Sequence, residues 1–202
     1  MHFKHSTFEH DKSKYYYKYD IESCPDWLFE DIKNEIVQSR DWTQTTGMAW
    51  RPPKGWMQEK APKCYNWIET VKEYDTAHIR FHLIPPRGRM NIHVDGTLEN
   101  PYTISYGKVN VKSVYGLNIP IMNYENAIMK WYDYSDKSNW KNDYVEPRDL
   151  LFNSRGGVPI DSSKCVVVDQ TVIDRPTAVR TDIPHSVDNP NDGTRVLLSI
   201  RF

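Results

Sequence analysis

The chain has 202 residues, a formal net charge of −1 at pH 7 and an aromatic content of 13%. This length suits one domain with a substantial core, and the balanced charge provides no basic field that would attract nucleic acid. Three cysteines without a Cys-x-x-Cys pair argue against a disulfide framework or a zinc ribbon. No signal-peptide pattern and no apolar run of membrane-spanning length is present, so we expect a soluble cytoplasmic protein without a membrane partner.

Residues 1–76 are predicted to form an N-terminal extension of the same domain, with flanking helices. The tyrosine-rich run 14–19 indicates an edge strand or a partner surface, and we favour the edge strand. Residues 25–40 begin with proline and carry apolar residues at helical spacing, which predicts a helix packed on a sheet. The segment 42–63 is rich in Pro, Gly and Trp and predicts a loop, either ordinary connecting structure or a cover over a site. A second short helix is expected over 64–74.

Residues 77–202 are predicted to form a β core, because the hydrophobic period changes there from helical to alternating. Further strands are expected over four segments: 111–122, 127–134, 165–169 and 177–181. The polar stretch 135–164 is an insertion in this core. Long polar insertions in a compact domain are usually functional or disordered.

The segment Asn91–Gly96 contains the pair of residues from which the functional prediction starts. His93 and Asp95 are two apart, so on a strand both side chains point to one face, about 6–7 Å apart along the chain. Leaning side chains can close that gap onto one ion, and His185 from a distant strand would complete the set. Such a pair also occurs by chance, with the histidine as an ordinary core or surface residue. By contrast, His78 and His82 are about 13 Å apart on a strand and cannot share an ion.

The segment after His185 adds an arginine at a defined place. Residues 191–194 predict a turn, and 195–202 alternate cleanly, with Val196, Leu198 and other apolar residues on one face. Arg195, ten residues after His185, therefore points off the opposite face of a strand that follows the second histidine.

These pieces together resemble the 2-oxoglutarate-dependent Fe(II) oxygenases. The motif His93-Val94-Asp95, then His185, then Arg195 has the order and spacing of that family. Residues 77–202 resemble in particular the aspartyl/asparaginyl β-hydroxylases and their relatives in bacteria and phages, and a phage origin would place the protein in the host cytoplasm. The resemblance implies a mainly β fold, with a double-stranded β-helix (jelly roll, cupin-like) core and two N-terminal flanking helices.

The resemblance also implies roles for individual residues. His93, Asp95 and His185 would be the catalytic metal ligands for Fe(II), a set that leaves coordination positions for 2-oxoglutarate and O2. Arg195 would anchor the distal carboxylate of 2-oxoglutarate, because a guanidinium offers two parallel donors to a carboxylate. His82 would assist at that carboxylate, or else be a hydrogen-bonded barrel histidine. Asn118 would lie against the proximal end, or else bond a neighbouring strand.

The expected activity is that of a dioxygenase, specifically a hydroxylase, that couples decarboxylation of 2-oxoglutarate to C–H oxidation. Its substrate would be the side chain of a peptide or protein, or a small molecule. In the family that the chain resembles, such insertions lie near the substrate entrance, so the stretch 135–164 is our candidate for substrate contact. The alternative is a non-catalytic jelly-roll module, for binding or structure, that retains a metal site. Two positions bear on the resemblance: Leu197 stands where many oxygenases have serine, and Asp95 is a ligand that some animal β-hydroxylases lack.

Overall fold

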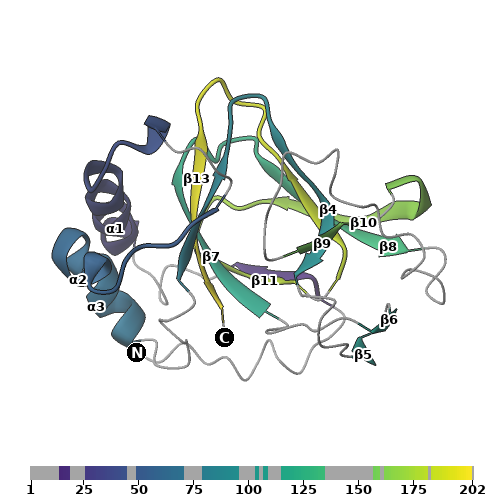
Figure 1. Cartoon of the computed structure of the whole chain (residues 1–202), viewed down its shortest axis with the longest axis horizontal. Coiled ribbons are helices and arrows are strands. Elements are labelled where there is room, and N and C mark those ends of the chain that lie inside the picture. The colour runs from purple at the N-terminus through teal and green to yellow at the C-terminus, as the bar shows by residue number, and fades with distance from the viewer. Residues whose placement is uncertain are drawn as a thin grey trace.

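Two antiparallel β-sheets, with helices against one of them, make up the described part of this computed structural model (Figure 1). The structure describes residues 14–18, 26–44, 49–70, 79–95, 103–104, 107–108, 115–134, 157–159, 162–181 and 183–201. Within these ranges no helix is long and apolar enough to cross a membrane. The expectation of a mainly β fold is confirmed.

The strands are distributed over two large sheets and one short pair. The six-stranded sheet has the order β1 (Tyr16–Lys18), β11 (Thr177–Arg180), β7 (Tyr115–Met122), β13 (Arg195–Arg201), β3 (Arg80–Ile84) and β2 (Ala49–Trp50). The five-stranded sheet has the order β10 (Cys165–Val172), β8 (Ile128–Tyr134), β12 (His185–Asp188), β4 (Arg89–Asp95) and β9 (Gly157–Pro159). A separate pair consists of β5 (Thr103–Ile104) and β6 (Gly107–Lys108).

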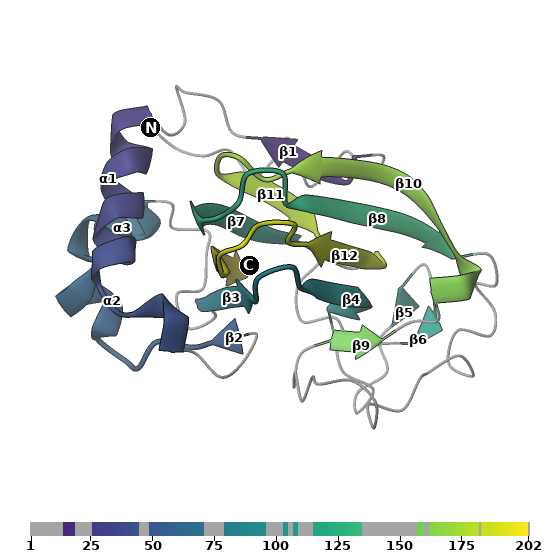
Figure 2. The same cartoon turned by 90° about the horizontal axis from the view of Figure 1, so that it is seen from above.

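Several connections between the described strands carry the chain from one large sheet to the other. β3 and β4 lie in different sheets, as do β7 and β8, β11 and β12, and β12 and β13. The last strand, β13, pairs with both β3 and β7, and β12 lies between β4 and β8 (Figure 2). The C-terminal segment therefore contributes an inner strand to each sheet, which brings residues 185–201 next to residues 80–95.

The helices cover the outer face of the six-stranded sheet (Figure 1). They are α1 (Asp26–Gln38), α2 (Trp56–Lys60) and α3 (Pro62–Thr70). Ile32 and Ile36 of α1 pack in one cluster with Phe81 of β3 and with Leu198 and Ile200 of β13. These side chains are buried because the alternation along each strand turns every second residue toward the helices.

A second apolar cluster fills the space between the two sheets. Ile84 of β3 and Leu197 of β13 meet Met129 and Trp131 of β8 and Val187 of β12 there. The residues of β3 and β13 that alternate with this inner set face the helices instead. A polar side chain on the inner face of either sheet therefore needs a specific partner, because burial among apolar residues removes it from water.

Several local predictions need correction against this fold. The edge strand near residues 14–19 and the helix over 25–40 are confirmed as β1 and α1. The loop expected over 42–63 is wrong, because it contains a 3-10 helix (Trp42–Gln44), β2 and α2. Two flanking helices were expected, and the described chain has three.

The polar insertion 135–164 contains regular secondary structure. Its described residues form β9, which pairs with β4, and a 3-10 helix at Ser162–Lys164. The remainder of the insertion, Gly96 and the proposed boundary at residues 76–77 lie outside the described residues. The division into an extension and a core therefore stays a prediction.

Three turns at one end of the sheets are tied together by asparagine side chains. The Asn189 amide nitrogen donates to the carbonyl oxygens of Ile84 (3.1 Å), Pro85 (3.0 Å) and Gly193 (3.0 Å). The Asn191 amide donates to the carbonyl oxygen of Asn123 in the turn between β7 and β8 at 2.8 Å. The segment that leads into Arg195 is thus held to the two other turns at this end.

We expect Asn189→Ala to lower the free energy of unfolding by about 2–4 kcal/mol, because buried carbonyl groups lose their donor. Asn189 is 1% exposed, so water cannot replace the amide at low cost. Urea denaturation checks this value. Asn34→Ala on the exposed face of α1 is the control and should change stability by less than about 0.5 kcal/mol. Equal effects of the two substitutions would contradict a structural role for Asn189.

Candidate metal and cosubstrate site

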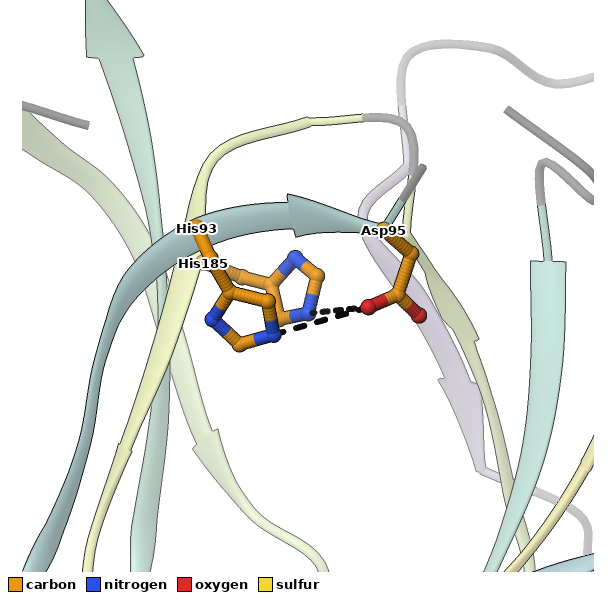
Figure 3. Close-up of side chains that lie close together, drawn as sticks. All are labelled: His93, Asp95 and His185. Atoms are coloured by element: carbon orange, nitrogen blue, oxygen red, sulfur yellow. Dashed lines mark ion pairs between the residues drawn. The ribbon is translucent and has the colours of Figure 1, made fainter. Parts of the chain in front are cut away.

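The two histidines of the predicted site lie directly opposite each other on neighbouring strands. His93 of β4 and His185 of β12 are register partners, and their ring centroids are 4.4 Å apart. Asp95 follows His93 by two residues and so lies on the same face of β4. Figure 3 shows the two imidazole rings side by side, both directed toward the Asp95 carboxylate.

The distances among the three side chains suit a shared cation. His93 Nε2 is 3.5 Å and His185 Nε2 is 4.0 Å from Asp95 Oδ1. One ligand atom from each residue lies within 4.8 Å of the other two. Ligand atoms about 2 Å from a metal ion are roughly 3 Å from one another when adjacent, so only small side-chain movements are needed. The structure brings the three residues together, and metal binding by them stays a prediction.

Backbone carbonyl groups determine which imidazole nitrogen of each histidine can act as a ligand. His93 Nδ1 lies 2.8 Å from the Asn91 carbonyl oxygen, and His185 Nδ1 lies 2.8 Å from that of Ile183. A carbonyl oxygen only accepts hydrogen bonds, so the neutral ring carries its proton on Nδ1. The lone pair is then on Nε2, the atom that faces Asp95. This arrangement is typical of metal-binding histidines.

The position of Asp95 is also determined by its backbone. The Asp95 amide donates to the Thr181 carbonyl oxygen at 3.0 Å, which ties the end of β4 to the segment before β12. On its other side β4 pairs with β9, where Asp95 is the register partner of Gly157. The carboxylate therefore projects from a strand end held on both sides.

A β-bulge in β4 changes which residues face the site. His185 is opposite His93, but Val187 is opposite Met90, so three steps along β4 match two along β12. The extra residue turns Met90 and His93 to the same side, and both line one pocket with His185. Simple alternation would have placed Met90 on the opposite face from His93.

Arg195 lines the same pocket and is buried at 1% exposure. Its Nε has no hydrogen-bond partner, and no described carboxylate pairs with its guanidinium. Burial lowers the pKa of Arg195 from its usual value to about 10, which is still far above neutral pH. The pocket therefore holds a cation whose charge is not balanced by the described residues.

Asn118 and His82, the two assisting residues of the prediction, also line this pocket. The Asn118 amide oxygen accepts a 2.8 Å hydrogen bond from Ser199 of β13, so the expected bond to a neighbouring strand is present. Pocket lining and this structural bond coexist in Asn118. His82 and Leu197 are register partners on β3 and β13, and both face the pocket.

Several pocket residues were not predicted. Thr181 is buried and lines the pocket next to the histidines, and Met129 and Val179 contribute apolar walls. The alternation of β8 and β11 could have indicated the inner face of each strand. The sequence contains no signal for which of these residues meet across the two sheets, because that depends on non-local pairing.

Comparison with known proteins gives no match by sequence and only distant likeness by structure. No family model matches the chain, and no curated protein does. AviO1 from Streptomyces viridochromogenes Tue57 is 13% identical with a TM-score of 0.40, covering 88% of this chain and 85% of AviO1. HygX from Streptomyces hygroscopicus, solved with nickel and 2-oxoglutarate bound, is 10% identical with a TM-score of 0.41, covering 87% and 77%.

A further similar structure is SnoK, described as a non-heme alpha ketoglutarate dependent carbocyclase from nogalamycin biosynthesis. It is 16% identical with a TM-score of 0.29, covering 60% of this chain and 46% of SnoK. Scores at this level do not assign a function. That must come from the chemistry of the site.

Proposed function

We propose that this protein is an Fe(II)- and 2-oxoglutarate-dependent oxygenase built on a double-stranded β-helix, or jelly-roll, core. Eight strands support this fold: β3, β4, β7, β8, β10, β11, β12 and β13. Numbered one to eight along the chain, they have the order 6-3-8-1 in one sheet and 5-4-7-2 in the other. Such interleaving of early and late strands in two facing sheets is the pattern of a jelly roll.

The observation that carries the functional proposal is the buried charge of Arg195 in the pocket of the two histidines. A buried guanidinium without a carboxylate partner is costly, so its retention indicates that a ligand supplies the anion. A set of two imidazoles and one carboxylate supports a metal ion that also binds a small oxygen-donor ligand. A short dicarboxylate such as 2-oxoglutarate satisfies both requirements at once.

Each residue of the site has a defined task in this proposal. His93, Asp95 and His185 would hold the iron, and Arg195 would bind the distal carboxylate of 2-oxoglutarate through paired donors. When bound, the iron supplies activation of dioxygen for C–H oxidation, coupled to conversion of 2-oxoglutarate to succinate and CO2. Met129, Val187 and Leu197 contribute apolar side chains to the lining of the same pocket.

The finer assignment follows from the sequence resemblance. We propose a hydroxylase of the aspartyl/asparaginyl β-hydroxylase type, acting on a peptide or protein side chain or on a small molecule. The near-neutral chain, with a net charge of −1, favours such substrates over nucleic acid.

A thermal-shift titration under anaerobic conditions, with Mn(II) in place of iron, tests the proposed cosubstrate. We expect 2-oxoglutarate at 100 times its Kd to stabilise the protein by about 2.7 kcal/mol. The matched ligand is 2-oxobutyrate, which has the same metal-binding end but no distal carboxylate and should give little shift. Equal shifts from both ligands, or none from either, would contradict the proposal.

Succinate formation distinguishes an enzyme from a binding module. With Fe(II), 2-oxoglutarate and O2 we expect slow release of succinate and CO2 even without a prime substrate. A protein that binds Mn(II) and 2-oxoglutarate yet never forms succinate, with or without candidate substrates, would instead be a non-catalytic jelly-roll module.

A further inference from the structure

Trp131 lies next to the candidate metal site but does not line its pocket. On β8 it is the register partner of His185, so the two side chains are on the same inner face of the sheet. Trp131 is fully buried, at 0% exposure. Its indole Nε1 donates to the Arg180 carbonyl oxygen at 3.0 Å, which links the five-stranded sheet to the end of β11 in the other sheet.

The segment that receives this hydrogen bond is the one that holds Asp95. The Arg180 amide donates to the Tyr15 carbonyl oxygen at 2.9 Å, while the Arg180 carbonyl accepts from Trp131. The next residue, Thr181, accepts from the Asp95 amide at 3.0 Å. The Arg180 N–H, the Arg180 C=O and the Thr181 C=O are therefore all hydrogen-bonded. The last of these bonds holds the backbone of Asp95, the residue that carries the carboxylate ligand.

The N-terminal strand completes this arrangement. The Tyr16 ring is stacked on Trp131, with centroids 5.4 Å apart and an interplanar angle of 18°, and the Tyr15 ring is 6.1 Å from Trp131. β1 pairs with β11 through Tyr16 and Val179. The stacked ring therefore comes from the strand next to β11, which ends at Arg180. β1 lies beside β11, and the rings of Tyr15 and Tyr16 pack against the indole of Trp131.

We propose that Trp131 is a positioning residue for the candidate metal site, acting on Asp95 through the backbone of Arg180 and Thr181, with β1 holding the indole in place. The inference rests on the proposed metal-binding function. A metal site tolerates ligand displacements of only about 0.5 Å, so loss of the indole N–H should affect the metal more than the fold. Residues that orient ligands in this way typically change metal affinity about 10- to 100-fold when substituted.

Trp131→Phe tests this, and the chain offers a closely matched control. Trp42, 3% exposed, also donates from its indole Nε1 to a backbone carbonyl oxygen, that of Ile36, at 3.0 Å. Trp42 lies in the helical layer and does not line the pocket, so Trp42→Phe removes the same kind of bond outside the site. Co(II) titration, followed by the visible absorption of the bound ion, gives the metal affinity, and urea denaturation shows that each variant folds.

We expect Co(II) to bind at least about 10-fold more weakly to Trp131→Phe than to the wild type, and within about 2-fold of wild type to Trp42→Phe. Both variants should lose a similar amount of stability, because each loses one buried indole hydrogen bond and part of a buried ring. Tyr16→Leu, which keeps the indole bond but removes the stacked ring, should give an intermediate loss of Co(II) affinity.

Two results would overturn the inference while leaving the proposed function intact: wild-type Co(II) affinity in Trp131→Phe, or an equal loss in the two tryptophan variants. A wild-type protein that binds no Co(II) would instead remove the metal site and, with it, the role of Trp131.

Discussion

Arg195→Met is expected to abolish 2-oxoglutarate binding while leaving the unliganded protein at least as stable as the wild type. The guanidinium is buried with no described carboxylate beside it, and burial lowers its pKa from its usual value to about 10. At pH 7 the charged form is therefore held at a cost of roughly 3 kcal/mol. Methionine fills a similar space without charge, and replacing buried charges by apolar side chains is often neutral or stabilising. Urea denaturation and the 2-oxoglutarate thermal shift measure the two effects.

Arg87→Met is the matched control for this substitution. Arg87 lies in the turn between β3 and β4, where its guanidinium forms an exposed ion pair with Asp192 at 2.7 Å. Loss of an exposed pair changes stability by about 0–1 kcal/mol, and 2-oxoglutarate binding should be unaffected. A large loss of stability in Arg195→Met, combined with unchanged 2-oxoglutarate binding, would show instead that Arg195 has a structural role.

The faces of individual strands follow from the sequence alone. Alternation in residues 79–84 and 195–201 predicts which side chains share a face, and the structure confirms it, with Phe81 and Leu198 against the helices and Leu197 between the sheets. The pattern is reliable because the period of two is a local property of an extended chain. The helix over residues 25–40 follows in the same way from its spacing of apolar residues.

Features that depend on pairing between distant segments are not predictable from local patterns. The bulge in β4 arises only in register with β12, and it moves Met90 to the face of His93. β9 forms within a stretch whose polar composition favours a loop, because β4 offers it an edge. The bonds from Asn189 likewise join turns that lie far apart in the sequence.

Two kinds of information together predict the three ligand residues. The spacing of His93 and Asp95 places them on one face whatever the partner strand, whereas His185 reaches them only through strand pairing. The resemblance to a known family supplied that pairing. Neither source indicated that carbonyl groups two residues before each histidine would orient Nε2 toward Asp95.

The second large effect is expected from Asp95→Ala, which should lower Fe(II) or Co(II) affinity by at least 100-fold, about 2.7 kcal/mol, and abolish succinate formation. The carboxylate supplies the only negative charge among the three ligand side chains, and both imidazole Nε2 atoms lie within 4.0 Å of its Oδ1. Alanine leaves two neutral nitrogen ligands, a much weaker site for a divalent ion. Metal titration followed by a succinate assay measures both consequences.

Asp188→Ala is the control for Asp95→Ala. It removes a carboxylate from the same sheet without removing a predicted metal ligand. Asp188 ends β12, the strand of His185, but it pairs with Lys130 at 2.8 Å and is 42% exposed. Its removal should change stability by less than about 1 kcal/mol and leave metal affinity within about 2-fold. Succinate formation at the wild-type rate in Asp95→Ala would take Asp95 out of the site. A parallel loss of metal in Asp188→Ala would show that the sheet, rather than the Asp95 carboxylate, determines metal binding.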